Sequence, residues 1–174
     1  MKVRFNLLIC LVLLVSIMST SCAVETKKHE IETPVLELKA NGPLFKGSNT
    51  STATWEFSMQ DLFPSVEGEI IIEKAKITAI SIQPRSDLDL PKISKMVMEM
   101  KSKYTKMNRI GLLEINIQKD KSYNLKLVDK QEELAVAITD ERITFVGDFN
   151  MLDEDFYGDV IFDLQVNFEI ETRK

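Results

Sequence analysis

The chain has 174 residues, with 22 lysines and arginines against 27 aspartates and glutamates, which gives a net charge of −5. This length predicts a single domain, and the acidic balance excludes the basic surface on which nucleic-acid binding depends. The chain has two cysteines, Cys10 and Cys22, which excludes a disulfide-rich scaffold.

The first 22 residues have the pattern of a secretion signal. A basic start is followed by an almost uniformly apolar stretch over residues 5–18, and three small polar residues then precede Cys22. The apolar stretch has 14 residues, whereas a membrane-spanning helix needs about 20. Ordinary cleavage and an uncleaved membrane anchor are the alternatives to a signal that ends at Cys22.

Cys22 and the residues before it resemble the lipobox of bacterial lipoproteins. Ser19 and Ser21 stand where such signals usually carry leucine and a glycine or alanine. The resemblance implies that residues 1–21 are a signal peptide and that Cys22 becomes a lipidated first residue, which makes the membrane a partner. It also implies a cell-envelope location. Ala23, in place of an aspartate that retains lipoproteins at the inner membrane, points to the outer membrane of a Gram-negative bacterium.

Removal of residues 1–21 leaves 174 − 21 = 153 residues, in which Cys22 is the one cysteine. The folded part then has no disulfide, and its stability must come from burial of apolar side chains. Residues 23–33 are mostly polar or charged and show no apolar period. We therefore expect a lipidated N-terminus and flexible tether over residues 22–33 and a folded domain over residues 34–174.

Apolar residues alternate with polar ones along most of this domain, which predicts β-strands. Within the expected strand at 69–83 the apolar phase changes between Ala79 and Ile80, which predicts a bulge or a crossing between sheets. Residues 93–103 also suit a helix by composition, but the alternation of Met96, Met98 and Met100 favours a strand. The expected strands of this part are 35–38, 53–59, 69–83, 93–103, 110–118 and 123–127.

The remaining elements complete an all-β pattern. Residues 47–51 are expected to form a polar turn, residues 131–139 a short helix, and residues 143–149 and 160–170 two clear strands. About seven or eight short strands predict an antiparallel immunoglobulin-like β-sandwich with one short helix, preceded by the signal peptide. A lipocalin-like barrel is the rival architecture.

The acidic segment between the last two strands contains the weak metal candidates Asp153, Asp155 and Asp159. Clustered carboxylates can hold Ca²⁺, but Tyr157 and Leu164 occupy positions where a calcium loop needs ligands. We interpret the segment as a solvated hairpin turn and expect no metal or other cofactor.

Catalytic groups are scarce. The one histidine, His29, lies in the expected tether, so no serine or threonine of the domain is expected to have a histidine base. Trp55 and the three methionines at 96, 98 and 100 fit core positions. We therefore expect a non-enzymatic module that binds another envelope protein or a surface component. A carrier of an apolar ligand in a barrel or parted sandwich is the alternative.

Overall fold

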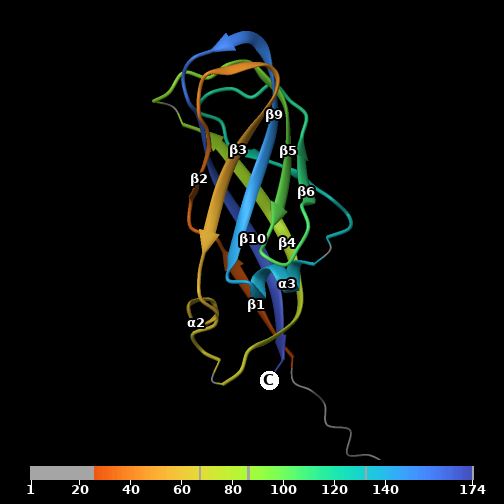
Figure 1. The fold of residues 1–174 in the computed structure, drawn as a ribbon. Coiled ribbons are helices and arrows are strands. Elements are labelled where there is room, and N and C mark those ends of the chain that lie inside the picture. Colours follow the sequence, from red (N-terminus) through yellow and green to blue (C-terminus); the bar gives the residue numbers. More distant parts are fainter. Residues whose placement is uncertain (1–25, 67, 86, 132, 174) are drawn as a thin grey trace, which may run out of the picture.

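The computed structural model describes residues 26–66, 68–85, 87–131 and 133–173 (Figure 1). Within these ranges the chain forms ten β-strands and two short helices, and it has no helix long and apolar enough to cross a bilayer. The strands are β1 (Thr26–Glu32), β2 (Leu36–Ala40), β3 (Leu44–Glu56), β4 (Ile71–Pro84), β5 (Ile93–Lys101), β6 (Asn108–Leu113), β7 (Tyr123–Asn124), β8 (Lys126–Leu127), β9 (Arg142–Phe156) and β10 (Val160–Arg173), and the helices are α2 (Met59–Leu62) and α3 (Leu134–Thr139).

All ten strands belong to one antiparallel sheet. Its order is β7-β4-β10-β2-β3-β9-β5-β6-β8, and β1 pairs with β10. The two ends of this order, β7 and β8, are separated in sequence by Leu125 alone. The Leu125 amide donates to the Ile80 carbonyl at 2.9 Å, and the Val128 amide donates to the Ile110 carbonyl at 3.2 Å. Residues 123–128 thus bond to β4 on one side and to β6 on the other, so the sheet is nearly a barrel. The sheet has ten strands, more than the seven or eight expected.

The last two long strands do not form a hairpin, which corrects the interpretation of the acidic segment as a hairpin turn. In the sheet, β2 and β3 lie between β10 and β9. The chain therefore passes over one end of the β2–β3 pair, in the spatial order of a Greek key. The rings of Phe149 on β9 and Phe162 on β10 nonetheless lie 6.1 Å apart, so they meet across the interior.

β10 runs through the centre of the molecule (Figure 1) and contributes an unbroken inner face. Its even-numbered residues from Val160 to Ile170 are buried, while its odd-numbered residues are half-buried. This burial confirms the predicted face, because a period of two places alternate side chains on opposite sides of a strand. The Trp55 ring of β3 stacks on Phe168 at 5.7 Å, and Met96, Met98 and Met100 of β5 are buried as expected.

The predicted phase change in residues 69–83 is a β-bulge. Asn167 pairs with Ala79 but Phe168 pairs with Ile77, so Thr78 is an extra residue on β4. The bulge brings Ile77 and Ile80 to the same side, and both are buried. A second register shift lies further along the same pair of strands.

Residues 26–32 are a strand, which corrects the expected tether in that range. Every residue of β1 pairs with β10, from Thr26 opposite Arg173 to Glu32 opposite Asn167. The ladder continues at Thr33, whose amide donates to the Val166 carbonyl and whose hydroxyl accepts from the Val166 amide, both at 3.0 Å. Pro34 has no amide hydrogen and ends β1.

Other strand and helix boundaries also differ from those expected from the sequence. The expected turn at 47–51 lies inside β3, where the register shifts between Phe45 and Gly47 and the left-handed φ of 105° at Gly47 accommodates the irregularity. Strand β6 ends at Leu113 rather than at residue 118, and β9 extends to Phe156. Helix α3 keeps the expected type but starts at Leu134, and it buries Leu134, Ala137 and Ile138.

Candidate functional site

The predicted lipidation residue, Cys22, lies outside the described residues, as do the whole signal segment and residues 22–25 of the expected tether. Thr26, the first described residue, begins β1 four positions after Cys22. The described chain thus starts directly in the sheet.

The three weak metal candidates are held by separate partners. Asp153 accepts from the Lys92 amide at 2.8 Å, and Asp159 pairs with Lys39 at 2.8 Å and accepts from the Gly42 amide at 3.0 Å. These bonds, that from Lys39 foremost, hold the pKa of Asp159 below its usual value. Asp155 is exposed on β9 opposite Phe45. Among the described residues, no three carboxylate, histidine or cysteine side chains are grouped as metal ligands.

His29 is part of the fold, which corrects its expected place in a tether. Its Nε2 lies 3.0 Å from the Thr172 hydroxyl, and its ring meets Phe63 edge-on at 4.8 Å. Burial, followed by the nearby Lys27 charge, lowers the pKa of His29. A histidine beside a hydroxyl resembles part of a nucleophile site, but Thr172 is only 4% exposed. A substrate therefore has no access to that hydroxyl, and the pair fixes β1 to β10.

The outer surface of β1, β10 and β4 carries rows of charged side chains. Lys28 lies 3.3 Å from both Glu169 and Glu171, while Lys76 and Lys74 approach the same two carboxylates from β4. Hydrogen bonds from Lys76 and Lys28 lower the pKa of Glu169, and the bond from Lys28 is the main cause of the lowered pKa of Glu171. This part of the surface is therefore a compensated ion-pair network.

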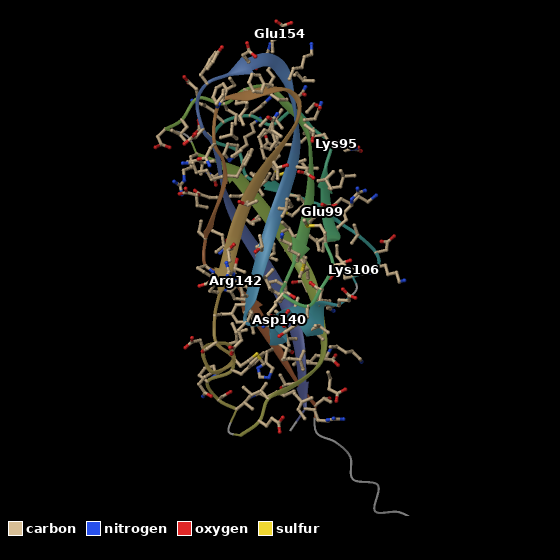
Figure 2. The ribbon with its side chains drawn as sticks, viewed as in Figure 1. Lys95, Glu99, Lys106, Asp140, Arg142 and Glu154 are labelled. Carbon is tan, nitrogen blue, oxygen red and sulfur yellow. The ribbon has the colours of Figure 1, made fainter. Side chains whose placement is uncertain are left out.

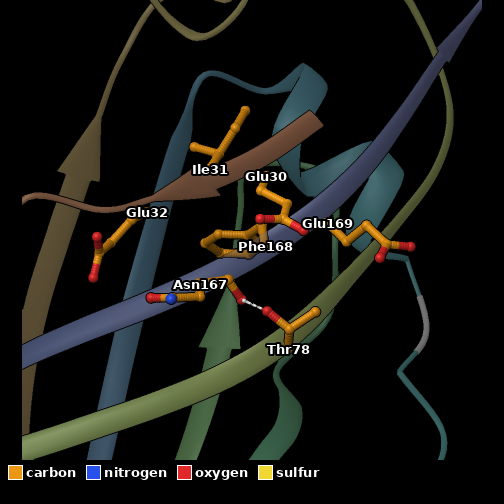
Figure 3. A pocket seen from close by; sticks show the side chains of 7 residues that line it. All are labelled: Glu30, Ile31, Glu32, Thr78, Asn167, Phe168 and Glu169. Atoms are coloured by element: carbon orange, nitrogen blue, oxygen red, sulfur yellow. Dashed lines mark hydrogen bonds between the residues drawn. The ribbon is translucent and has the colours of Figure 1, made fainter. Parts of the chain in front are cut away.

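The pairing of carboxylates with lysines does not extend to Glu30 and Glu32. Both side chains are exposed, and neither makes an ion pair or a side-chain hydrogen bond with any described residue. Glu30 lies directly opposite Glu169 in the β1–β10 ladder, and like charges in that position repel. With Asn167 and Thr78, both residues line an open hollow of about 410 Å³. Figure 3 shows the side chains of these residues. The hollow is acidic and contains no cation of its own among its lining residues.

The backbone of β1 is free along one edge. Thr33 donates to Val166, and in an antiparallel ladder every second residue bonds to the same neighbour, so the amides of Ile31 and His29 also face β10. The backbone groups of Lys28, Glu30 and Glu32 then face away from β10. Among the described residues, β1 pairs with β10 alone, and no other segment bonds to these three amides or carbonyls. We call this row the β1 edge.

A second charged surface lies beside α3. Asp140 accepts hydrogen bonds from the Ser102 hydroxyl and, at 3.0 Å, from the Tyr104 amide, while Glu133 accepts from the Lys106 amide at 3.3 Å. Figure 2 shows Asp140 and Lys106 in the same half of the barrel and Glu154 at its opposite end. These bonds shape the connection between β5 and β6.

No protein-family model matches the chain, and no curated protein matches it at a significant level.

Sequence reasoning missed the β1 edge because residues 26–32 are almost all polar. The signal that was present is the alternation of His29, Ile31 and Thr33 with Lys28, Glu30 and Glu32. That alternation has one aliphatic residue on its inner face, which is too weak a period to distinguish an edge strand from a charged tether.

Proposed function

We propose that the chain is a lipid-anchored protein of the cell envelope whose β-domain is a non-enzymatic module that binds another envelope protein or a surface component. The observation that carries the proposal is the lipobox-like sequence ending at Cys22, four positions before the start of the first described strand. Four residues extend to at most about 14 Å. Lipid on Cys22 would therefore hold the β1 end of the domain close to the bilayer, on the outer membrane in our proposal.

The packed interior supports a binding surface over an internal carrier site. Large side chains from different strands fill the space inside the sheet, and Met96, Met98, Phe145, Phe162 and Leu164 are all fully buried. An apolar ligand in a barrel requires lining side chains with accessible surface on the inner side. The described core side chains offer almost none, which disfavours the alternative of an apolar-ligand carrier.

The same packing supports a flattened barrel whose two walls face each other as the sheets of an immunoglobulin-like sandwich do. The Phe149–Phe162 contact joins strands that are three places apart in the sheet. Walls in direct contact leave the outer surfaces and free edges as the places for recognition.

The anchor is tested by the Cys22→Ser variant in a Gram-negative host. We expect wild-type protein to partition into detergent and to have a mature N-terminus at Cys22 with the added mass of acyl chains. The variant should remain an unprocessed precursor or become soluble, because a serine cannot form the thioether. A wild-type N-terminus that is unmodified, or that lies elsewhere than Cys22, would refute the anchor.

A further inference from the structure

The β1 edge combines two unsatisfied features. Its outward backbone amides and carbonyls at Lys28, Glu30 and Glu32 bond to no described residue, and the carboxylates of Glu30 and Glu32 pair with no cation in the described part of the chain. An unpaired strand edge is a template for another strand. Charged side chains on an edge also restrict which strands can pair with it, because like charges opposite each other repel.

We propose that the β1 edge is a strand-addition site for an extended peptide segment in which basic and aliphatic residues alternate. Backbone hydrogen bonds would supply affinity and alternate side chains would supply specificity, as in other strand-addition complexes. This inference deepens the proposed binding function by naming the surface and the chemistry of its partner.

The register defines what each face of the added strand meets. On the outer face, its basic residues would lie beside Glu30 and Glu32 and relieve the repulsion between Glu30 and Glu169. On the inner face, its aliphatic residues would lie beside Ile31, which is half-buried against the core.

The ends of the site are also defined. Pro34 ends β1 on one side, and Lys28 is already held by Glu169 and Glu171 on the other. The exposed Lys27 and Lys28 disfavour a partner cation at that end. The partner segment is therefore about as long as β1, which has seven residues.

The second copy of this chain is a weaker candidate for the occupant. An antiparallel β1–β1 pair centred on Glu30 would place the two Glu30 side chains opposite each other, and one centred on His29 would place Glu30 opposite Lys28, which Glu169 and Glu171 already hold. A basic partner strand has no such conflict.

The test uses the full chain in detergent micelles and a capped seven-residue peptide of alternating lysine and valine with a fluorescent label. Two control peptides have glutamate in place of lysine, or N-methyl groups that remove the backbone donors from one edge. We expect saturable binding of the lysine peptide and at least about tenfold weaker binding of both controls, since one control loses the charges and the other loses the ladder.

Protein variants locate the site. The double variant Glu30→Lys with Glu32→Lys should weaken binding of the lysine peptide about tenfold and strengthen that of the glutamate peptide. The control that matches this change of charge is Glu154→Lys with Asp155→Lys, two exposed acids, which should bind like wild type. Glu154 lies at the opposite end of the barrel (Figure 2). Unchanged melting temperatures would exclude misfolding.

Amide hydrogen exchange by NMR provides a second readout. Addition of a strand should slow exchange at Glu30 and Glu32, whose amides face outward, and should change His29 and Ile31 little, because these already bond to β10. Failure of the lysine peptide to bind, equal binding of the N-methylated peptide, an equal loss in Glu154→Lys with Asp155→Lys, or a concentration-dependent β1–β1 dimer would overturn the proposal. None of these outcomes bears on the mass of the mature N-terminus, so failure of the anchor is observed separately.

Discussion

Single residues decide how closely the strands of this sheet approach each other. Gly147 lies on β9 opposite Ser51 of β3, and the Ser51 hydroxyl, which is fully buried, donates to the Gly147 carbonyl at 2.9 Å. A Cβ atom at position 147 would lie 2.8 Å from that hydroxyl and 3.0 Å from a methyl group of Leu38. Glycine is thus required here by space rather than by backbone conformation.

We therefore expect Gly147→Ala to lower the free energy of unfolding by about 1–3 kcal/mol, the usual cost of overpacking a core. Chemical denaturation of the variant and the wild type measures this difference. The double variant Gly147→Ala with Ser51→Ala should lose less free energy of unfolding than the sum of the losses in the two single variants, because removal of the hydroxyl relieves part of the clash. Strict additivity would show that the two positions do not interact.

His29 shows how one residue can mislead sequence reasoning. Because His29 lies in a polar segment, the sequence predicted that no serine or threonine of the domain has a histidine beside it. In the structure, His29 bonds to the hydroxyl of the buried Thr172. The contact joins residues 143 positions apart, and no local pattern encodes a contact of that range.

At the scale of elements, β10 is the strand whose role could be deduced most fully from the sequence. Its apolar residues recur at every second position without interruption, and a one-residue slip would expose all of them. The structure confirms the buried face, and it places β1 and β2 on one side of β10 and β4 on the other. Loss of a large side chain here should affect the whole sheet.

We expect Phe162→Ala and Phe168→Ala each to cost about 3–5 kcal/mol, because each ring is fully or almost fully buried against another aromatic ring. Asn167→Ala on the outer face should cost about 0.5 kcal/mol or less, because its side chain makes no hydrogen bond with a described residue. Urea titrations of the three variants compare these costs. A loss at Asn167 as large as that at either phenylalanine would contradict one-sided burial.

The elements that were missed share a physical cause. The first half of β3 and the strand β1 have polar residues on their exposed faces and few apolar ones inside, so their periods are weak. The last residues of β9 are mainly acidic, and of residues 152–156 only Asp155 and Phe156 pair with β3 and only Phe156 packs on the core. In these strands, tertiary pairing overrides local composition.

Pairing itself could not be deduced from the sequence. Strong alternation in β9 and β10 indicated two strands but not their neighbours, and proximity in sequence suggested a hairpin. The structure separates them by β2 and β3. The candidate site depends on this pairing, because β1 borders β10 along one edge and pairs with no other described strand along its second edge.

At the scale of the whole molecule, closure of the sheet into a near-barrel depends on one short segment. Residues 123–128 join β4 to β6, and β7 and β8 have only two residues each. Leu125 is 5% exposed, and the site of a Cβ on Gly111 would lie 3.1 Å from its side chain. Leu125 is therefore the closely packed residue of the segment that joins β4 to β6.

We expect this segment to open before the rest of the barrel unfolds. The Leu125 and Val128 amides should exchange with solvent faster than the Val166 amide, and Leu125→Ala should accelerate their exchange further while costing about 2–5 kcal/mol in stability. Native-state hydrogen exchange by NMR measures both effects. Exchange of Leu125 and Val128 at the rate of Val166 would mean that closure and the central strands unfold together.

The pairing of the first described strands with the last one has a consequence for synthesis. The central strand β10 is the last of the described strands to leave the ribosome, and its partners β1 and β2 are the earliest of them to emerge. A nascent chain that stops before residue 160 lacks the side chains around which the interior is packed, so it cannot settle into the finished sheet. The finished sheet therefore forms only after β10 has been synthesised, and a chain exported as proposed would lack a complete sheet until then.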